Sequence, residues 1–97
     1  MSDKNILWLK LALADMANLL EWLEQKTDTE TANMVAQRIW DAANSLRVLP
    51  SRGRPGRVPD TREFQVANTS YFLVYRIKKN NVQILRVIHF YRNYPKN

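Results

Sequence analysis

The sequence contains no cysteine and only one histidine, His89. Disulfides and thiolate-bound metals are therefore impossible, and a metal site would need several carboxylates to converge on one point. No apolar run approaches the roughly 18 residues that span a bilayer, and the N-terminus lacks the pattern of a secretory signal peptide. We therefore expect a cytoplasmic protein that binds no membrane and needs neither a metal nor a cofactor.

Glycine is also scarce. Both glycines and three of the four prolines fall within residues 50–61, and this concentration predicts a loop. The chain of 97 residues is long enough for one modest hydrophobic core, so we expect a single domain over residues 1–97.

Acidic residues are nearly missing from the second half of the chain. Residues 1–49 carry five basic and seven acidic side chains, whereas residues 50–97 carry ten basic side chains against only Asp60 and Glu63. Such a surface attracts anionic partners, which can be nucleic acids or acidic proteins.

Apolar spacing predicts a strand and two helices in the first half. A short apolar run at residues 6–9 suits a strand. Between residues 11 and 25 apolar side chains recur at helical spacing, namely Leu13, Met16, Ala17, Leu20 and Leu23. Thr27 and Glu30 have the spacing of a capping box, which predicts the start of a second helix that Pro50 ends. Its apolar positions are Ala32, Val35, Ala36, Ile39, Ala43, Leu46 and Leu49.

Beyond residue 61 the apolar period changes to two, which predicts strands at residues 63–66 and 71–77. Asn80 and Asn81 suit a tight turn with positive φ, and residues 82–88 supply a last strand. The predicted fold class is α+β, in the order β-α-α-β-β-β, with an antiparallel sheet packed on an N-terminal helical hairpin.

Several ordered motifs resemble one known family. They are GRPGRVP at residues 53–59, TRE at 61–63, YFLVYR at 71–76, ILRVIH at 84–89, Arg92 and Pro95, with Trp8, Ala12, Asp15 and Trp22 upstream. On these residues the chain is identified as a member of the RelE/ParE family, in its ParE-like branch. The resemblance implies the toxin of a bacterial type II toxin–antitoxin system, of the kind that stabilises plasmids. It also implies an acidic antitoxin encoded next to the toxin, and a toxin–antitoxin hetero-oligomer.

The family contains two activities. Its RelE-type members cleave messenger RNA on the ribosome, whereas its ParE-type members poison DNA gyrase. RNA cleavage needs a proton acceptor, a proton donor and cations near the phosphate. Glu63, Gln65 and Phe72 stand where the RNA-cleaving members have cations. The resemblance therefore favours a non-catalytic gyrase inhibitor, and a ribosome-dependent endoribonuclease that uses His89, Tyr91, Arg86 and Arg92 is the alternative.

Two sets of contact residues are expected. The predicted target-binding residues are Arg57, Arg86, His89, Tyr91, Arg92 and Tyr94, because arginine and tyrosine dominate many interfaces. The predicted antitoxin-binding residues are Trp22, Trp40 and Arg76.

Each set has a structural alternative. His89 can end the last strand and hydrogen-bond locally, and Arg76 and Arg86 can pair with Glu63 or Asp15. Trp22 and Trp40 can flank the core, while Phe90 and Tyr94 can fold back to close it.

Overall fold

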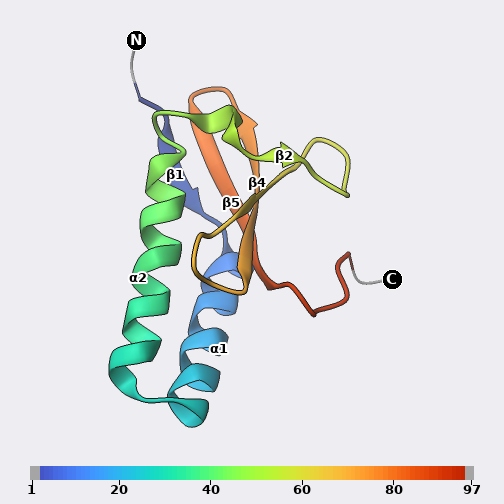
Figure 1. Ribbon diagram of the computed structural model, residues 1–97. Helices are drawn as coiled ribbons and strands as arrows, with labels where there is room; N and C mark the ends of the chain where they lie inside the picture. Colours follow the sequence, from blue (N-terminus) through green and yellow to red (C-terminus); the bar gives the residue numbers. More distant parts are fainter. Residues whose placement is uncertain (1–2, 96–97) are drawn as a thin grey trace.

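The computed structural model describes residues 3–95, which form one helical hairpin and one sheet (Figure 1). The elements are β1 (Asn5–Trp8), α1 (Lys10–Lys26), α2 (Thr29–Ser45), the 3₁₀ turn η1 (Pro50–Arg52), β2 (Arg54–Pro55), β3 (Arg62–Gln65), β4 (Tyr71–Lys78) and β5 (Asn81–His89). The predicted α+β fold with an N-terminal helical hairpin is confirmed. Within this part of the chain, neither helix is long and apolar enough to cross a membrane.

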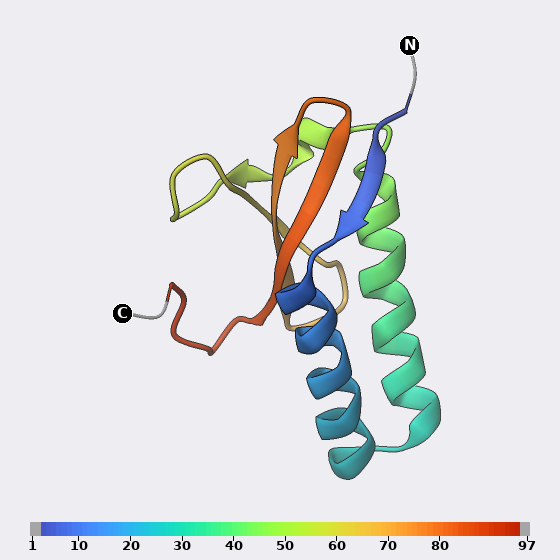
Figure 2. The ribbon, with the colours of Figure 1, turned by 180° about the vertical axis from the view of Figure 1, so that it is seen from behind.

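The sheet has five strands in the order β1-β5-β4-β3-β2. The pairs β3–β4 and β4–β5 are antiparallel, as expected, and so is the pair of β3 with β2, a strand that was not predicted. Strand β1, however, runs parallel to β5, with Asn5 beside Asn81 and Trp8 beside Ile84. The predicted wholly antiparallel sheet is therefore wrong at this edge. Side-chain alternation shows which face of a strand is buried, but it carries no information on the direction of a partner far away in the sequence. Figure 2 shows β1 lying along β5 on the outer side of the sheet.

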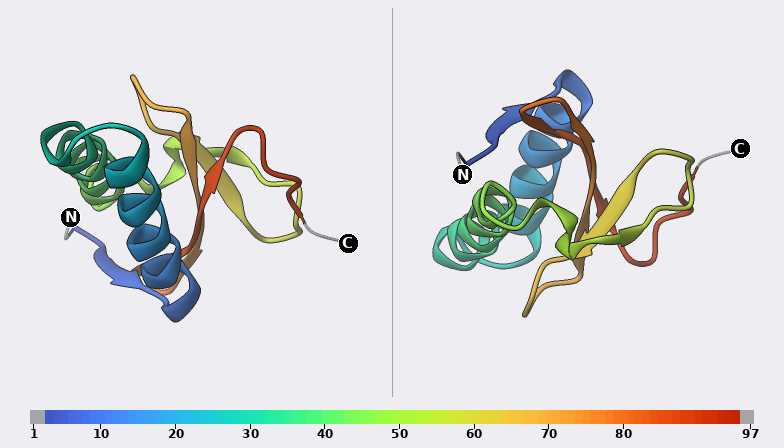
Figure 3. Two further views of the ribbon diagram at one scale, coloured as in Figure 1. Left: turned by 90° about the horizontal axis from the view of Figure 1, so that it is seen from below. Right: turned by 90° about the horizontal axis from the view of Figure 1, so that it is seen from above.

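The two faces of the sheet are covered differently. The helices pack on one face, and the loop before β3 and the C-terminal tail lie on the other (Figure 3). The core between helices and sheet is built from Ala12, Leu19, Leu23, Ala32, Ile39, Ala43, Leu46, Val66, Tyr71, Leu73, Tyr75, Val82, Ile84 and Val87. On the opposite face Phe72, Val74 and Ile88 form a small cluster against Leu85 and Tyr94.

Helix α1 buries a face rotated from the predicted one. Leu13 and Ala17 are exposed, whereas Ala12, Asp15 and Leu19 are buried. Leucine occurs on both sides of this helix, so apolar spacing alone fits either orientation. The buried face contains a carboxylate, which a hydrophobic pattern cannot anticipate.

The predicted capping box at the start of α2 is also wrong. Asp28 caps the helix, since its side chain accepts a hydrogen bond of 2.7 Å from the amide of Thr31. This hydrogen bond lowers the pKa of Asp28. Thr27 belongs to the end of α1, where its hydroxyl donates to the carbonyl of Leu23. The helix ends at Ser45 instead of continuing to Pro50, and Leu49 is exposed.

Two turns differ from expectation in detail. The predicted loop at residues 50–61 contains η1 and the short strand β2, because Arg54 and Pro55 pair with Glu63 and Arg62. In the β4–β5 turn, Lys79 takes the positive φ of 55° that was expected of asparagine.

Candidate functional site

Strand β5 extends past the end of β1. Strand β1 pairs only with Asn81–Ile84, and within residues 3–95 no other strand pairs with the rest of this edge of β5. Asp15 from α1 takes the place of the missing neighbour. Its carboxylate accepts hydrogen bonds from the Val87 amide (2.9 Å) and from Nε and Nη2 of Arg86 (2.8 and 3.1 Å). The predicted structural alternative for Arg86 is therefore confirmed, with Asp15 as the partner.

This pair is tight and mostly buried. The Asp15 side chain is 8% exposed and that of Arg86 is 27% exposed. The hydrogen bonds that Arg86 donates to Asp15 raise the pKa of Arg86, so the guanidinium remains charged. Because two oxygens of one carboxylate already hold it, Arg86 is poorly placed to clamp a phosphate.

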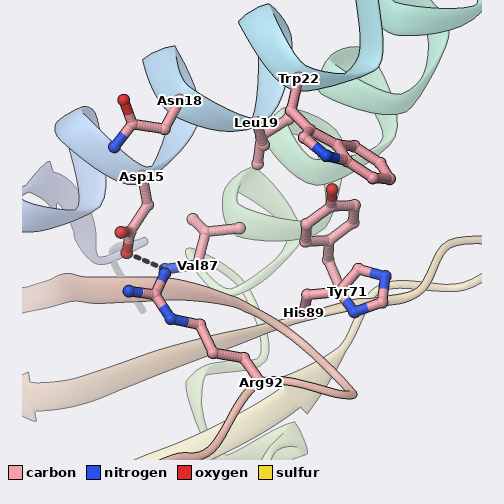
Figure 4. Close-up of a pocket in the computed structure, with 8 residues that line it drawn as sticks. All are labelled: Asp15, Asn18, Leu19, Trp22, Tyr71, Val87, His89 and Arg92. Carbon is pink, nitrogen blue, oxygen red and sulfur yellow. Dashed lines mark hydrogen bonds between the residues drawn. The ribbon is translucent and has the colours of Figure 1, made fainter. Parts of the chain in front are cut away.

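A groove of about 340 Å³ lies between α1 and this edge of β5, and we call it the edge groove (Figure 4). It is lined by Asp15, Asn18, Leu19, Trp22, Tyr71, Val87, His89 and Arg92. Figure 4 shows Trp22 beside Tyr71 at one end, while Arg92 reaches from the tail toward Asp15 at the other. The lining is therefore aromatic and aliphatic at one end and charged at the other.

His89 is the last residue of β5 and makes local contacts, as its structural alternative anticipates. Its Nδ1 accepts a hydrogen bond of 3.2 Å from the amide of Tyr91. Its ring packs edge-on against Tyr71, with 5.1 Å between the ring centroids. Among residues 3–95, no carboxylate is in hydrogen-bond contact with this imidazole.

The opposite face of the sheet holds a second group of predicted target-binding residues. The Arg57 guanidinium lies over the rings of Phe72 and Tyr94, at 5.2 and 5.9 Å from their centroids. Arg57 also donates to the Tyr94 carbonyl oxygen at 3.1 Å. Burial raises the pKa of the Tyr94 hydroxyl, and the negative charge of Glu63 adds to the effect. Tyr94 thus closes the small cluster around Phe72.

Beside Tyr94 lies a shallow apolar hollow of about 390 Å³ lined by Leu9, Lys10, Leu11, Val58, Thr61, Val74, Leu85, Arg86 and Tyr94. The predicted target-binding residues therefore divide between two surfaces. Arg57, Arg86 and Tyr94 lie on the tail face of the sheet, whereas His89 and Arg92 line the edge groove. Tyr91 is 90% exposed, and its ring lies 5.4 Å from that of His89.

Glu63, Gln65 and Phe72 line one hollow beside the central strands, together with Arg52 and Arg54. Glu63 is buried and accepts from Arg54 Nη2 (3.1 Å) and from the Arg57 amide (2.9 Å). Phe72 is buried beside it. Gln65 is exposed and neutral.

The three predicted antitoxin contacts do not form one surface. Trp22 is half exposed in the edge groove. Trp40 is 43% exposed on α2 and stacks on Trp8, with 4.8 Å between ring centroids and 13° between ring planes. Arg76 donates to the Gln83 side chain, so its predicted pairing with Glu63 or Asp15 is wrong.

Sequence reasoning missed four lining residues of the edge groove, namely Asn18, Leu19, Tyr71 and Val87. The available signal was Asp15, a carboxylate on the otherwise apolar buried face of α1. For residues 3–95, no group of three or more His, Asp or Glu side chains is close enough to hold a metal ion.

Comparison with known families decides the classification. The model described as "ParE toxin of type II toxin-antitoxin system, parDE" matches residues 6–94. The chain belongs to the ParE toxin family. It is also 38% identical over 96 residues to a relative in Sinorhizobium fredii described as "Putative toxin Y4kP", and this match covers 99% of the chain and 98% of the relative.

Solved structures of ParE and RelE systems share the fold. A chain of the chromosomal ParDE system from P. aeruginosa superposes with a TM-score of 0.82 at 24% identity, covering 89% of this chain and 95% of that one. A chain of the toxin–antitoxin complex RelBE2 from Mycobacterium tuberculosis superposes with a TM-score of 0.67, also at 24% identity, covering 90% and 98%. Both superpositions show that the fold is shared.

Proposed function

We propose that this ParE-family toxin acts in the cytoplasm by binding and inhibiting DNA gyrase, without catalysing a reaction, and that an adjacent acidic antitoxin neutralises it. The observation that favours gyrase inhibition over RNA cleavage is the identity of the side chains on the central strands. Where an RNA-cleaving relative would need cations, this protein has a buried, ion-paired Glu63 and a buried Phe72. The strand positions themselves offer a phosphate an apolar ring and a carboxylate, and the neighbouring Arg54 and Arg57 are already paired with Glu63.

The residues named for the alternative activity also lack a catalytic arrangement. Arg86 is held by Asp15, and His89 uses Nδ1 to bind its own chain. A ribonuclease needs a base and an acid on opposite sides of the scissile phosphate, with cations beside it. His89 and Arg92 both line the edge groove, and the Tyr91 ring lies 5.4 Å from that of His89, but Arg92 is the one arginine or lysine in this lining.

Two observations support an antitoxin partner. The second half of the chain is strongly basic, which favours rapid association with an acidic protein. The similar solved chains come from ParDE and RelBE2 toxin–antitoxin systems. A stable hetero-oligomer with the neighbouring gene product is the expected resting form, and plasmid stabilisation is a role that suits such a pair.

The target is tested with purified protein and purified gyrase. We expect loss of DNA supercoiling, with or without trapped cleavage complexes, and intact messenger on translating ribosomes. Tyr91→Ala should weaken the inhibition about tenfold or more while leaving the melting temperature unchanged, because Tyr91 is 90% exposed. Val48→Ala, also at an exposed position, is the matched control and should inhibit like the wild type.

The alternative makes the opposite forecast. Codon-specific cuts in ribosome-bound messenger that disappear in His89→Ala, together with unaffected gyrase, would establish an endoribonuclease and refute gyrase inhibition.

A further inference from the structure

The edge groove has the shape and chemistry of a socket for one side chain. Its volume of about 340 Å³ lies at the low end of the roughly 300–1,000 Å³ of small-molecule pockets, which suits a single large side chain. Building on the proposed antitoxin partner, we propose that an acidic antitoxin segment inserts one large apolar side chain into this groove and places an adjacent carboxylate at Arg92.

The apolar end of the groove is ready to bury such a side chain. Leu19 and Val87 are buried and form a fixed floor. Trp22 remains 50% exposed although it lies beside this floor, and Tyr71 stands next to it (Figure 4). A partner side chain between Trp22 and Val87 would remove a large aromatic surface from water. Buried tryptophan side chains of this kind are typical of interface hot spots.

The charged end of the groove favours an anion. The negative charge of Asp15 is already matched by Arg86. The Arg92 side chain forms no ion pair with any other residue in the range 3–95, and it is exposed. A carboxylate next to the inserted side chain would therefore meet an available guanidinium, whereas a lysine or arginine there would meet repulsion.

A protein segment fits the groove better than a nucleic-acid strand. Single-stranded nucleic acids need a row of cations along the backbone in addition to stacking aromatics. Arg92 is the one arginine or lysine among the lining residues. One cation beside a mainly apolar floor matches a short acidic motif.

Occupation of the groove would also neutralise the toxin directly. His89 and Arg92 line the groove and belong to the predicted target-binding surface. A segment seated there covers both, so antitoxin and target compete for the same residues. Tyr91 does not line the groove, so its substitution should weaken target binding without weakening antitoxin binding.

The first test measures the affinity of the purified protein for the acidic product of the adjacent reading frame. Trp22→Ala should weaken binding about 30-fold or more, and Arg92→Ala about tenfold. Met34→Ala and Lys78→Ala are the controls, because they remove an exposed apolar and an exposed cationic side chain outside the groove, and each should stay within about twofold of the wild type. Equal losses for Trp22→Ala and Met34→Ala, or no loss for Trp22→Ala, would overturn the groove proposal.

The second test does not depend on removing Trp22. In a Trp8→Phe, Trp40→Phe protein, Trp22 is the only tryptophan, and its emission should shift to the blue when the antitoxin binds. Complex formation without a shift would place the antitoxin elsewhere. A shift produced at physiological salt by a single-stranded oligonucleotide in place of the antitoxin would overturn the proposal in favour of nucleic-acid binding.

The two proposals fail separately. If the neighbouring protein does not bind the wild type at all, the antitoxin part of the proposed function fails and the groove proposal fails with it. If it binds and protects cells but ignores Trp22, only the groove proposal is refuted.

Discussion

Asp15 is a single carboxylate that joins helix α1 to the edge of the sheet. It accepts from the Val87 amide and from two nitrogens of Arg86, so three donors depend on it. Without Asp15, the Val87 amide and the partly buried guanidinium would have no partner in the structure. The residue therefore holds together one wall of the edge groove.

Asp15→Ala should lower the free energy of unfolding by about 2–3 kcal/mol, because it leaves a buried amide and a mostly buried charge without a hydrogen-bond partner. Asp15→Asn keeps an acceptor for the amide and should lose about half as much. Urea denaturation of both variants measures the difference. Asn18→Ala, one turn away on the same helix and exposed, is the control, and equal losses for Asp15→Ala and Asn18→Ala would contradict this role.

Tyr75 ties the loop at residues 50–53 to the core. Its side chain is fully buried, and its hydroxyl accepts from the Gly53 amide (2.9 Å) and donates to the Pro50 carbonyl (2.7 Å). Any side chain at residue 53 would collide with it, since a Cβ there would lie 2.6 Å from the hydroxyl oxygen. Tyr75→Phe should therefore cost about 1–3 kcal/mol of stability, measured by urea denaturation at pH 7.

The same residue predicts an alkaline limit of stability. Burial raises the pKa of the Tyr75 hydroxyl, so the folded state holds its proton more tightly than the unfolded state. The stabilisation is complete below the unfolded pKa of about 10 and is lost as the pH rises above it. Urea midpoints between pH 8 and 11 should fall less steeply for Tyr75→Phe than for the wild type. A residual slope should remain, because burial also raises the pKa of Tyr71.

At the scale of elements, Glu63 links strand β3 to the preceding loop and, through Arg57, to the tail. Its carboxylate lies 3.1 Å from Arg54 Nη2 and 3.5 Å from Arg57 Nε. Arg57 in turn binds the carbonyl of Tyr94. One buried carboxylate thus holds two segments that the sheet does not hold by itself.

Glu63→Gln should loosen the loop at residues 54–61 and the tail at residues 90–94 together. The amide keeps the shape of the side chain but loses the charge that attracts both arginines. Hydrogen exchange in the two segments should quicken several-fold, while exchange in β4 and β5 stays slow. Glu21→Gln changes an exposed carboxylate on α1 and should alter neither segment. A tail unaffected by Glu63→Gln would mean that packing of Tyr94 on Phe72 suffices to hold it.

At the scale of the whole molecule, the charge is unevenly distributed. The N-terminal half supplies the helical hairpin with a small excess of acidic groups, and the C-terminal half supplies the sheet, the loop and the tail with a large excess of basic groups. An acidic partner is therefore attracted to the sheet and tail more than to the helices. The edge groove lies where these two parts meet.

This distribution predicts that salt slows association. The rate constant for binding the acidic neighbouring protein should fall about tenfold between roughly 50 and 300 mM NaCl, because exposed charges are screened beyond about 10 Å. The dissociation rate should change much less, since it depends on the buried contacts. Stopped-flow mixing measures both rates, and a salt-independent association rate would contradict electrostatic attraction.

Sequence patterns were sufficient to predict the class of fold, the two helices, the main strands and the uneven charge of the two halves. These follow from local rules: the spacing of apolar side chains, the clustering of glycine and proline, and the count of charges along the chain. The ordered motifs in residues 53–95 also identified the family that the comparison then confirmed. The pairing of Arg86 with Asp15 was anticipated as one of two options.

The details that make a site depend on how the folded chain packs in three dimensions. The direction of β1, the buried face of α1 and the edge groove all depend on contacts between residues far apart in the sequence, such as Asp15 with Val87. A periodic pattern specifies that one face is buried, but not which partner buries it or how far one strand extends past another. For the same physical reason, the sequence grouped Trp22 with Trp40, and only the packing of helices on the sheet placed Trp22 in a groove and Trp40 on Trp8.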